Sequence, residues 1–276
     1  MNAQTATAAA ASSSSLILLR EDIAGVAILT LNRPQARNSL SEALLEALGD
    51  ALTAIAHERS VLVVVLTANG PAFSAGHDLK ELNARRKDED RGRAYFKHIM
   101  GLCSDVMQQI VTLPQPVIAA VQATATAAGC QLVASCDLAV ASHSAKFATP
   151  GVNIGLFCST PMVALSRNVT RKAAMEMLLT GEMISAEEAA RIGLINHVVA
   201  PGAERDEALK LAKKIAAKSP LTAKIGKEAF YRQIEMPLAD AYRYTSEVMV
   251  ENMLARDAEE GIAAFIEKRD PKWEGR

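Results

Sequence analysis

The stretch VIAAVQATATAAGCQLVASCDLAVA, residues 117–141, holds two apolar runs separated by small and polar residues. The runs at 117–121 and 138–141 predict buried strands, and residues 129–135 between them predict a short helix. A strand, a helix and a second strand at this spacing form a crossover, so the two strands are expected to be parallel neighbours. This stretch therefore predicts an α/β fold.

The same pattern extends toward the N-terminus. The continuous β-branched run VLVVVLT at 61–67 predicts a strand buried on both faces. Apolar runs at 16–20 and 26–31 flank a polar turn and predict a β-hairpin. Amphipathic patterns predict helices at 41–57 and 91–112.

Beyond residue 141 the chain becomes increasingly helical. Ser185 to Glu188, SAEE, has the pattern of a capping box, and Gly193 suits a left-handed helix stop. GLINHVV then predicts one more strand. After Pro201, helices are predicted at 204–218, 223–233, 238–256 and 258–268.

Composition excludes several classes of protein. The chain has 276 residues, half of them hydrophobic, and a net charge of -1, which gives no electrostatic case for nucleic acid or an anionic membrane. Four cysteines form no CxxC motif or metal-like cluster, so reduced thiols, no metal and a cytoplasmic location are expected. Residues 107–135 carry no charge, but Pro114 and Pro116 argue against a membrane span. Residues 1–15 lack the features of a signal or transit peptide and predict a disordered tail.

Two predicted strand-to-helix loops, at 69–82 and 121–137, are candidates for a binding site. Ligands of parallel α/β folds bind at the carboxyl ends of strands, where two loops can direct backbone N–H groups at one oxyanion. Small residues at 127–129 allow a ligand to approach the backbone closely. From the residues alone, tight packing of a helix start explains the same pattern.

Five motifs stand out along the chain: LNRPQARNSL at 31–40, FSAGHDLKEL at 73–82, AAGCQLVASCDLAVAS at 127–142, FATPGVNIGL at 147–156 and LLTGEMISAEEAARIGLINHVV at 178–199. Together they resemble the enoyl-CoA hydratase/isomerase (crotonase) superfamily. The resemblance covers about residue 16 to the C-terminus, and the SAGHDLKEL and GLFCSTP stretches are most similar to the subgroup of enoyl-CoA hydratase domain-containing protein 3.

The resemblance implies a ClpP/crotonase-like fold of repeated ββα units. Residues 16–200 would form the acyl-CoA-binding core, and residues 201–276 a helical trimerisation region. The chain would assemble as a homotrimer or a dimer of trimers. Its ligand would be an acyl-CoA thioester, with coenzyme A as part of the substrate and no separate cofactor.

The resemblance also assigns a site. The backbone N–H groups of His77 and Ala128 would form an oxyanion hole for the thioester oxygen, although the family usually has glycine at the second position. The residues expected along coenzyme A are Ala36, Arg37, Ala75, His77, Asp78, Leu79, Lys80, Phe265 and Lys268.

Two acids expected from the resemblance are absent. Hydratases of this family move protons with two glutamates, at the positions of Gln131 and Gly151. An amide is no general base near neutral pH, and glycine has no side chain. Since positioned acid–base catalysis contributes about 10²–10⁴-fold, hydration of 2-enoyl-CoA to 3-hydroxyacyl-CoA is expected to be weak or altered.

Alternatives remain open at this level. Another residue could replace the glutamates, the candidates being Glu81, His98, Cys158 and Glu182, or a bicarbonate ion could act as the base. The chain could also bind or sense acyl-CoA without catalysis. RNA binding through the basic stretch at 210–218 has less support, because a solvated helix face explains that stretch. A Clp-type protease has less support because no serine nucleophile motif is present.

Overall fold

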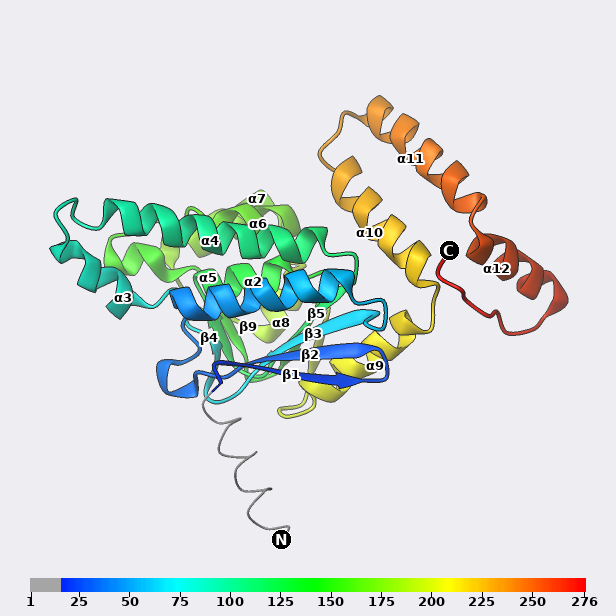
Figure 1. Ribbon diagram of the computed structural model, residues 1–276. Coiled ribbons are helices and arrows are strands. Elements are labelled where there is room, and N and C mark those ends of the chain that lie inside the picture. Colours follow the sequence, from blue (N-terminus) through cyan, green and yellow to red (C-terminus); the bar gives the residue numbers. More distant parts are fainter. Residues whose placement is uncertain (1–15) are drawn as a thin grey trace, which may run out of the picture.

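The structure, a computed structural model, describes residues 16–276. The tail predicted at residues 1–15 lies outside this part of the chain. Figure 1 shows a body of strands covered by helices, and a helical arm that extends away from it.

The larger of two sheets confirms the predicted crossover. Its strand order is β1-β2-β3-β5-β7-β10, and every pairing except β1 with β2 is parallel. β5 and β7 are neighbours in this sheet, and α5 (Ala128–Ser135) lies between them in the sequence. The strands are β1 (Leu18–Ile23), β2 (Val26–Leu31), β3 (Val63–Ala68), β5 (Val117–Val121), β7 (Leu138–Ser142) and β10 (His197–Val199).

Strand β3 is buried on both faces, as its continuous apolar run predicted. Val64 and Leu66 belong to one buried cluster, whereas Val63 and Val65 belong to a second cluster on the opposite face. The first cluster also includes apolar residues of α2 (Glu42–His57) and α4 (Arg93–Thr112), and the second is closed by α9 (Glu204–Ala216). Because helices cover both faces, residues 63–66 of this strand are apolar on both faces.

A second sheet of four short strands lies beside the first, in the order β4-β6-β8-β9. Each of β3, β5 and β7 is followed by one of its strands, which gives the repeated ββα arrangement that the resemblance implied. The sequence patterns did not identify these strands because two or three residues show no periodicity. They are β4 (Ala72–Ser74), β6 (Thr124–Thr126), β8 (Lys146–Ala148) and β9 (Ile184–Ser185).

The first hairpin differs from its prediction. Its turn is only Ala24 and Gly25, both with positive φ, rather than the five residues 21–25. Two-residue turns with positive φ match the twist of paired strands, but alanine gives no signal for one. Glu21 and Asp22 therefore belong to β1, where an edge strand leaves charged side chains exposed.

Among the helices over the body, α2 and α4 closely follow their predicted bounds of 41–57 and 91–112, whereas no bounds were predicted for α3, α6 or α7. Ser41 caps α2 by accepting from the Leu44 N–H, and Ser185 caps α8 by accepting from the Glu188 N–H. The reciprocal half of the predicted capping box is wrong, because the Glu188 carboxylate pairs with Arg191. These helices are α2 (Glu42–His57), α3 (Leu79–Ala84), α4 (Arg93–Thr112), α6 (Pro161–Asn168), α7 (Arg171–Thr180) and α8 (Ala186–Arg191).

The arm consists of α10 (Pro220–Gln233), α11 (Leu238–Met253) and α12 (Arg256–Glu267). Figure 1 shows α11 and α12 standing clear of the sheets. Buried Asp257 ties the end of the chain to the start of α10, since its carboxylate accepts from the Ser219 hydroxyl and from the Glu274 and Gly275 N–H groups. The arm nevertheless exposes many large apolar side chains, including Leu238, Leu254, Phe265 and Ile266.

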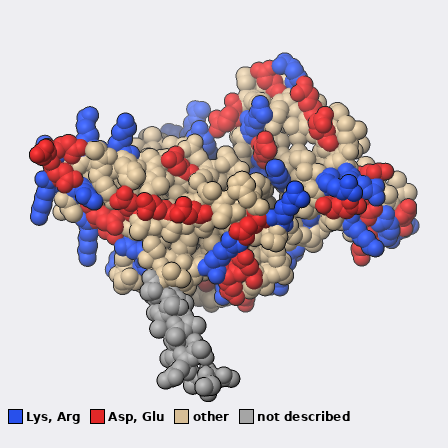
Figure 2. All heavy atoms as spheres, viewed as in Figure 1, with Lys and Arg blue, Asp and Glu red and all other residues tan. Residues whose placement is uncertain are grey.

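Charge and hydropathy add two observations. Basic and acidic side chains are intermixed on the face seen in Figure 2, with no broad area of one sign. Within residues 16–276, no helix has both the length and the apolar character to cross a membrane.

Candidate active site

The first predicted loop places an unpaired amide at the end of β4. Leu40 N–H donates to Gly76 O at 2.8 Å, and Asp78 N–H donates to Leu40 O at 3.4 Å. These two bonds hold the loop against the start of α2 and direct the intervening His77 N–H to the other side. That N–H has no acceptor within the described part of the chain.

The second loop places a matching amide at the start of α5. Ala127 N–H donates to Ala148 O at 2.9 Å, and Ala127 adopts a left-handed φ of 50°. This sharp turn begins α5 at Ala128, whose N–H has no helical acceptor because it is the first residue of the helix. Residues 16–276 supply no other acceptor for it.

Two glycines bring the loops together. A Cβ atom added to Gly76 would lie 3.2 Å from Ala128 N and 2.9 Å from Ala127 Cβ. A Cβ atom added to Gly129 would lie only 2.2 Å from Ser74 O. The two unpaired N–H groups therefore lie on adjoining backbone, which is the arrangement that stabilises a developing oxyanion.

Buried polar atoms without partners occur on residues that adjoin these amides along the backbone. Seven buried side-chain nitrogen or oxygen atoms lack a hydrogen-bond partner among the described residues, and four of them belong to His77, Gln131 and Thr149. Thr149 directly follows Ala148, the acceptor for Ala127, and Gln131 lies on the first turn of α5, its N–H bonded to Ala127 O. Buried polar groups are normally paired, so this cluster indicates a site that hydrogen-bonds a ligand or water.

Burial favours the neutral form of the His77 imidazole. Burial lowers its pKa below the usual value for histidine, and the nearby Leu40 carbonyl opposes that shift without making a full hydrogen bond. A neutral ring can donate from one nitrogen and accept at the other. It adds hydrogen-bonding capacity to the site without adding charge.

Asp78 braces the first loop. Its Oδ1 accepts from the Lys80 N–H at 3.1 Å and caps α3, while its Oδ2 accepts from Arg33 and from the Ser39 hydroxyl, both at 3.1 Å. Burial alone would raise its pKa, but these hydrogen bonds outweigh burial and lower it. The carboxylate stays ionised and engaged with the loop.

Gln131 and Gly151 are the two positions at which the sequence resemblance led us to expect glutamates. Gln131 is only 4% exposed, and its Oε1 has no donor in residues 16–276. Gly151 is also buried, and its N–H donates to Cys158 Sγ at 3.3 Å. A Cβ at position 151 would lie 2.7 Å from Leu156 O and 2.9 Å from that sulfur. The backbone at residues 156–158 covers position 151, so a glutamate side chain would fit there only if that backbone moved.

Two of the possible replacement acids are committed elsewhere. The Glu81 carboxylate accepts from the Glu42 N–H at 3.1 Å, and His98 Nε2 lies 2.9 Å from Glu42 Oε1. Glu182 is exposed. Cys158 does adjoin the site, but burial raises the pKa of its thiol. Sequence patterns gave no sign that this cysteine covers Gly151, because the contact depends on how the loop folds back.

The residues predicted along coenzyme A fall into two groups. Ala36 and Arg37 adjoin the first loop, since Arg37 O accepts from the Ala75 N–H at 3.0 Å, and residues 77–80 continue that loop into α3. Phe265 and Lys268 lie instead on and just after α12, on the far side of the molecule from β4 in Figure 1. One chain therefore does not bring the two groups together.

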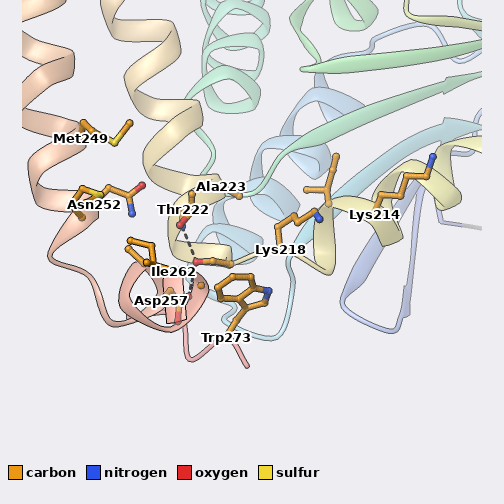
Figure 3. Close-up of a pocket in the computed structure, with 14 residues that line it drawn as sticks. Lys214, Lys218, Thr222, Ala223, Met249, Asn252, Asp257, Ile262 and Trp273 are labelled. Atoms are coloured by element: carbon orange, nitrogen blue, oxygen red, sulfur yellow. Dashed lines mark hydrogen bonds between the residues drawn. The ribbon is translucent and has the colours of Figure 1, made fainter. Parts of the chain in front are cut away.

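A separate groove of about 770 Å³ lies between α9, α10, α11 and α12 (Figure 3). Met249, Ile262 and Trp273 line its apolar part, and Lys214 and Lys218 lie on one side. None of the predicted site residues lines it. The unpaired polar atoms, rather than this groove, mark the candidate active site.

Comparison with known proteins agrees with the fold. The family model described as enoyl-CoA hydratase/isomerase matches residues 21–276. The chain is 49% identical to the rat and human proteins named enoyl-CoA hydratase domain-containing protein 3, mitochondrial, over 90% of its length and 81% and 80% of theirs.

Solved structures give the same result. A crystal structure of an enoyl-CoA hydratase from Mycobacterium smegmatis has a TM-score of 0.89 and 53% identity, covering 94% of this chain and 99% of that one. The crystal structure of human enoyl-CoA hydratase domain-containing protein 3 also has a TM-score of 0.89, with 48% identity over 94% of this chain and all of the other. By sequence and fold, the chain belongs to the enoyl-CoA hydratase/isomerase family.

Proposed function

We propose that the pocket between the two loops binds acyl-CoA thioesters, with the thioester oxygen accepting from the His77 and Ala128 N–H groups. The observation that carries this proposal is the pair of unpaired amides on adjoining backbone at Gly76. One such donor typically contributes about 10²–10³-fold to a rate when an oxyanion develops. The residues from Ala36 to Lys80 named above would follow the coenzyme A moiety.

The nominal reaction is hydration of a 2-enoyl-CoA to a 3-hydroxyacyl-CoA in fatty-acid metabolism, at a low rate. Hydration needs a base to deprotonate water and an acid to protonate C2. Gln131 supplies neither near pH 7, and Gly151 is covered by residues 156–158. The two N–H groups that would polarise the thioester are present, whereas neither position 131 nor position 151 carries a side chain that could transfer a proton. The proposed reaction needs no resident cofactor.

The assembly we propose is a homotrimer or a dimer of trimers. The exposed apolar side chains of the arm support this, since monomeric proteins rarely leave large contiguous apolar areas in water. The cytoplasmic location expected from the sequence remains a prediction, and several related proteins carry mitochondrial in their names. Subcellular fractionation of the tagged protein would decide between these compartments.

Titration calorimetry with butyryl-CoA and with free coenzyme A tests the binding proposal. We expect the thioester to bind more tightly than coenzyme A alone, because only the thioester occupies the two amides. Equal affinity, or no binding heat from any acyl-CoA, would contradict the proposal. Hydration of crotonyl-CoA and of a medium-chain 2-enoyl-CoA should then be slower by orders of magnitude than in a homologue with both glutamates.

A second candidate function is binding or sensing of acyl-CoA without any reaction. The covered position at Gly151 favours it, because the site has no evident proton carrier there. It predicts binding without turnover across a broad panel of thioesters. Efficient conversion of any of them, detected as product by mass spectrometry, rules it out.

A further inference from the structure

The His77 imidazole belongs to the oxyanion loop, and neither of its nitrogens is engaged. Both ring nitrogens are buried and have no hydrogen-bond partner among the described residues. By contrast, the Asp78 carboxylate pairs with Arg33, and the Glu81 carboxylate accepts from a backbone N–H at the start of α2. Burial keeps the Cys158 thiol protonated by raising its pKa. Of these four side chains, only the imidazole is free to accept a proton.

Space filling alone does not account for this ring. A buried polar atom without a partner lowers the stability of a fold, so buried polar groups are normally paired. An apolar side chain of similar size would fill the same volume without that cost. The two unpaired nitrogens of His77 therefore indicate a role that uses them when the site is occupied.

We propose that the His77 imidazole is the catalytic base that activates water for the hydration of a 2-enoyl-CoA. This inference rests on the proposed function, because it requires the thioester oxygen to accept from the His77 and Ala128 N–H groups. His77 would then serve the reaction twice, since its backbone stabilises the oxygen and its ring moves the proton. The ring supplies the base that Gln131 and Gly151 do not.

Covalent connectivity keeps the ring close to the reacting atoms. The imidazole is attached to the backbone that would donate to the thioester oxygen, so its nitrogens lie within about 6 Å of that N–H nitrogen in any rotamer. C2 and C3 of the substrate are the first and second carbons beyond the thioester carbonyl. A base reaches its proton at hydrogen-bond distance or through one water, and the ring of His77 is near enough to a water at C3 for this.

The Leu40 carbonyl determines which ring nitrogen keeps its lone pair. It is the acceptor that acts on the ring, and it opposes the effect of burial on the pKa of His77. A carbonyl favours the tautomer with the proton on the nitrogen that faces it, so the other nitrogen is left as an acceptor. Gln131 Oε1, which is also buried and unpaired, offers an acceptor for the second hydrogen of the attacking water. The neutral ring can therefore accept a proton from water without first losing one.

The bonds and charges balance with water as the only co-reactant. The free imidazole nitrogen takes a proton from water, whose oxygen forms a bond to C3. The electron pair of the C2–C3 double bond becomes the C1–C2 double bond of an enolate, and the negative charge lies on the thioester oxygen between the two backbone N–H groups. The imidazolium then returns its proton to C2, which gives the 3-hydroxyacyl-CoA and the neutral ring.

Burial, rather than a neighbouring charge, sets the protonation state of the ring. The titratable groups on the segments around the loop are Arg33, Arg37, Glu42, Asp78, Lys80, Glu81, His98 and Cys130. None of them shifts the pKa of His77, which burial lowers from the usual 6.5 and the Leu40 carbonyl raises. The ring is therefore neutral at pH 7 and able to act as a base. A lowered pKa also makes it a weaker base than an ordinary histidine, which agrees with slow hydration.

The experiment measures crotonyl-CoA hydration by the full chain between pH 5 and pH 8, and butyryl-CoA binding by calorimetry. His77→Gln keeps the backbone N–H but removes the base, so we expect turnover to fall at least about 100-fold while butyryl-CoA affinity stays close to the wild-type value. Wild-type kcat/KM should fall as pH drops below about 6.5, because the base becomes protonated, and His77→Gln should lack this step. His98→Gln, at an exposed histidine of α4, should behave like the wild type.

Added imidazole gives a second readout. His77→Ala leaves room for a free base, so its turnover should rise with imidazole concentration, whereas wild-type turnover should not.

Butyryl-CoA binding separates this inference from the proposed function. A folded His77→Gln variant that hydrates crotonyl-CoA as fast as the wild type, or that loses butyryl-CoA affinity by the same factor as turnover, would overturn the assignment of the base. If butyryl-CoA binds but the wild type hydrates only at the buffer rate, the assignment is wrong and thioester binding stands. If butyryl-CoA does not bind, both proposals are wrong.

Discussion

Ala127 carries backbone strain at the centre of the site. Its φ of 50° and ψ of -119° are costly for any residue with a Cβ, and its methyl group faces Gly76. Strain of this kind costs roughly 1–3 kcal/mol and persists where the surrounding structure enforces it. Here the enforced turn is what starts α5 at Ala128 and leaves that N–H unpaired.

Replacing Ala127 by glycine should therefore stabilise the fold. We expect Ala127→Gly to raise the free energy of unfolding by about 1 kcal/mol, the relieved strain exceeding the added backbone entropy of glycine. Urea denaturation of the two proteins measures this difference. Ala54→Gly, at an exposed position in the interior of α2, is the matched control and should instead destabilise by about 1 kcal/mol. A destabilised Ala127→Gly would show that the turn is not strained.

The Ala128 amide can be removed in that background. Proline at the first position of a helix is structurally tolerated, but it has no N–H to donate. Compared with Ala127→Gly alone, Ala127→Gly with Ala128→Pro should lose about 10²-fold or more in any thioester turnover. Steady-state rates and melting temperatures of both proteins test this. Unchanged turnover in a folded double variant would remove Ala128 from the oxyanion hole.

Restoring one glutamate should not restore hydration. Gly151→Glu places a side chain where Leu156 O and Cys158 Sγ already lie, so we expect it to destabilise the fold by roughly 1–3 kcal/mol. Crotonyl-CoA hydration should stay within about tenfold of the wild-type rate, because any carboxylate that is accommodated must displace the covering loop. A large gain in hydration would show that residues 156–158 move aside readily.

His77 should make stability depend on pH in a defined direction. Burial lowers the pKa of His77 in the folded state. Between that folded pKa and the unfolded value of about 6.5, the unfolded chain therefore binds a proton at His77 that the folded chain does not. This contribution is fully present above the unfolded pKa and is lost as pH falls through the folded pKa. Urea denaturation at pH 7.5, 6.0 and 5.0 should show a smaller loss in His77→Gln than in the wild type, whereas exposed His57→Gln should behave like the wild type.

At the scale of elements, a buried ion pair connects α10 of the arm to the segment that follows α5. Lys227 of α10 lies 2.8 Å from Asp137, the second residue after α5, and also donates to the carbonyls of Ile110 and Gln115. Asp137 in turn accepts from the Val117 N–H and the Tyr231 hydroxyl. These contacts join α10, the ends of α4 and α5, and the start of β5.

Removing one partner of this pair should be costly. Lys227→Met leaves Asp137 buried with a charge that is only partly compensated, so we expect a loss of about 3–5 kcal/mol in the free energy of unfolding. Lys224→Met, an exposed lysine one turn earlier on α10, should change stability little. Chemical denaturation of both variants measures the difference, and equal stabilities would show that the buried pair contributes nothing.

At the scale of the whole molecule, the exposed apolar arm predicts self-association. Phe265 is 86% exposed and Ile266 73% exposed, next to a groove that is itself apolar. We expect sedimentation equilibrium to give a trimer or a hexamer. Phe265→Glu combined with Ile266→Glu should weaken assembly without unfolding the body, since neither side chain belongs to either buried cluster. A monomeric wild-type protein would contradict this prediction.

The sequence by itself determined the parallel α/β core and the identity of the two loops. Long apolar runs and helical periodicities are local signals, and β3, β5, α2 and α4 formed within a few residues of their predicted bounds because each buries the face its pattern presents. Glutamine at 131 and glycine at 151, the positions where the resemblance led us to expect glutamates, could likewise be read from the sequence.

Only the tertiary structure decided the rest. The short strands β4, β6, β8 and β9 exist because neighbouring strands pair with them, and two or three residues carry no such information on their own. The approach of Gly76 to Ala128 joins segments far apart in the sequence, and the closure of Cys158 over Gly151 depends on how the loop between them folds back. Contacts of this kind depend on the packing of whole elements, and that packing is where the chemistry of the site is set.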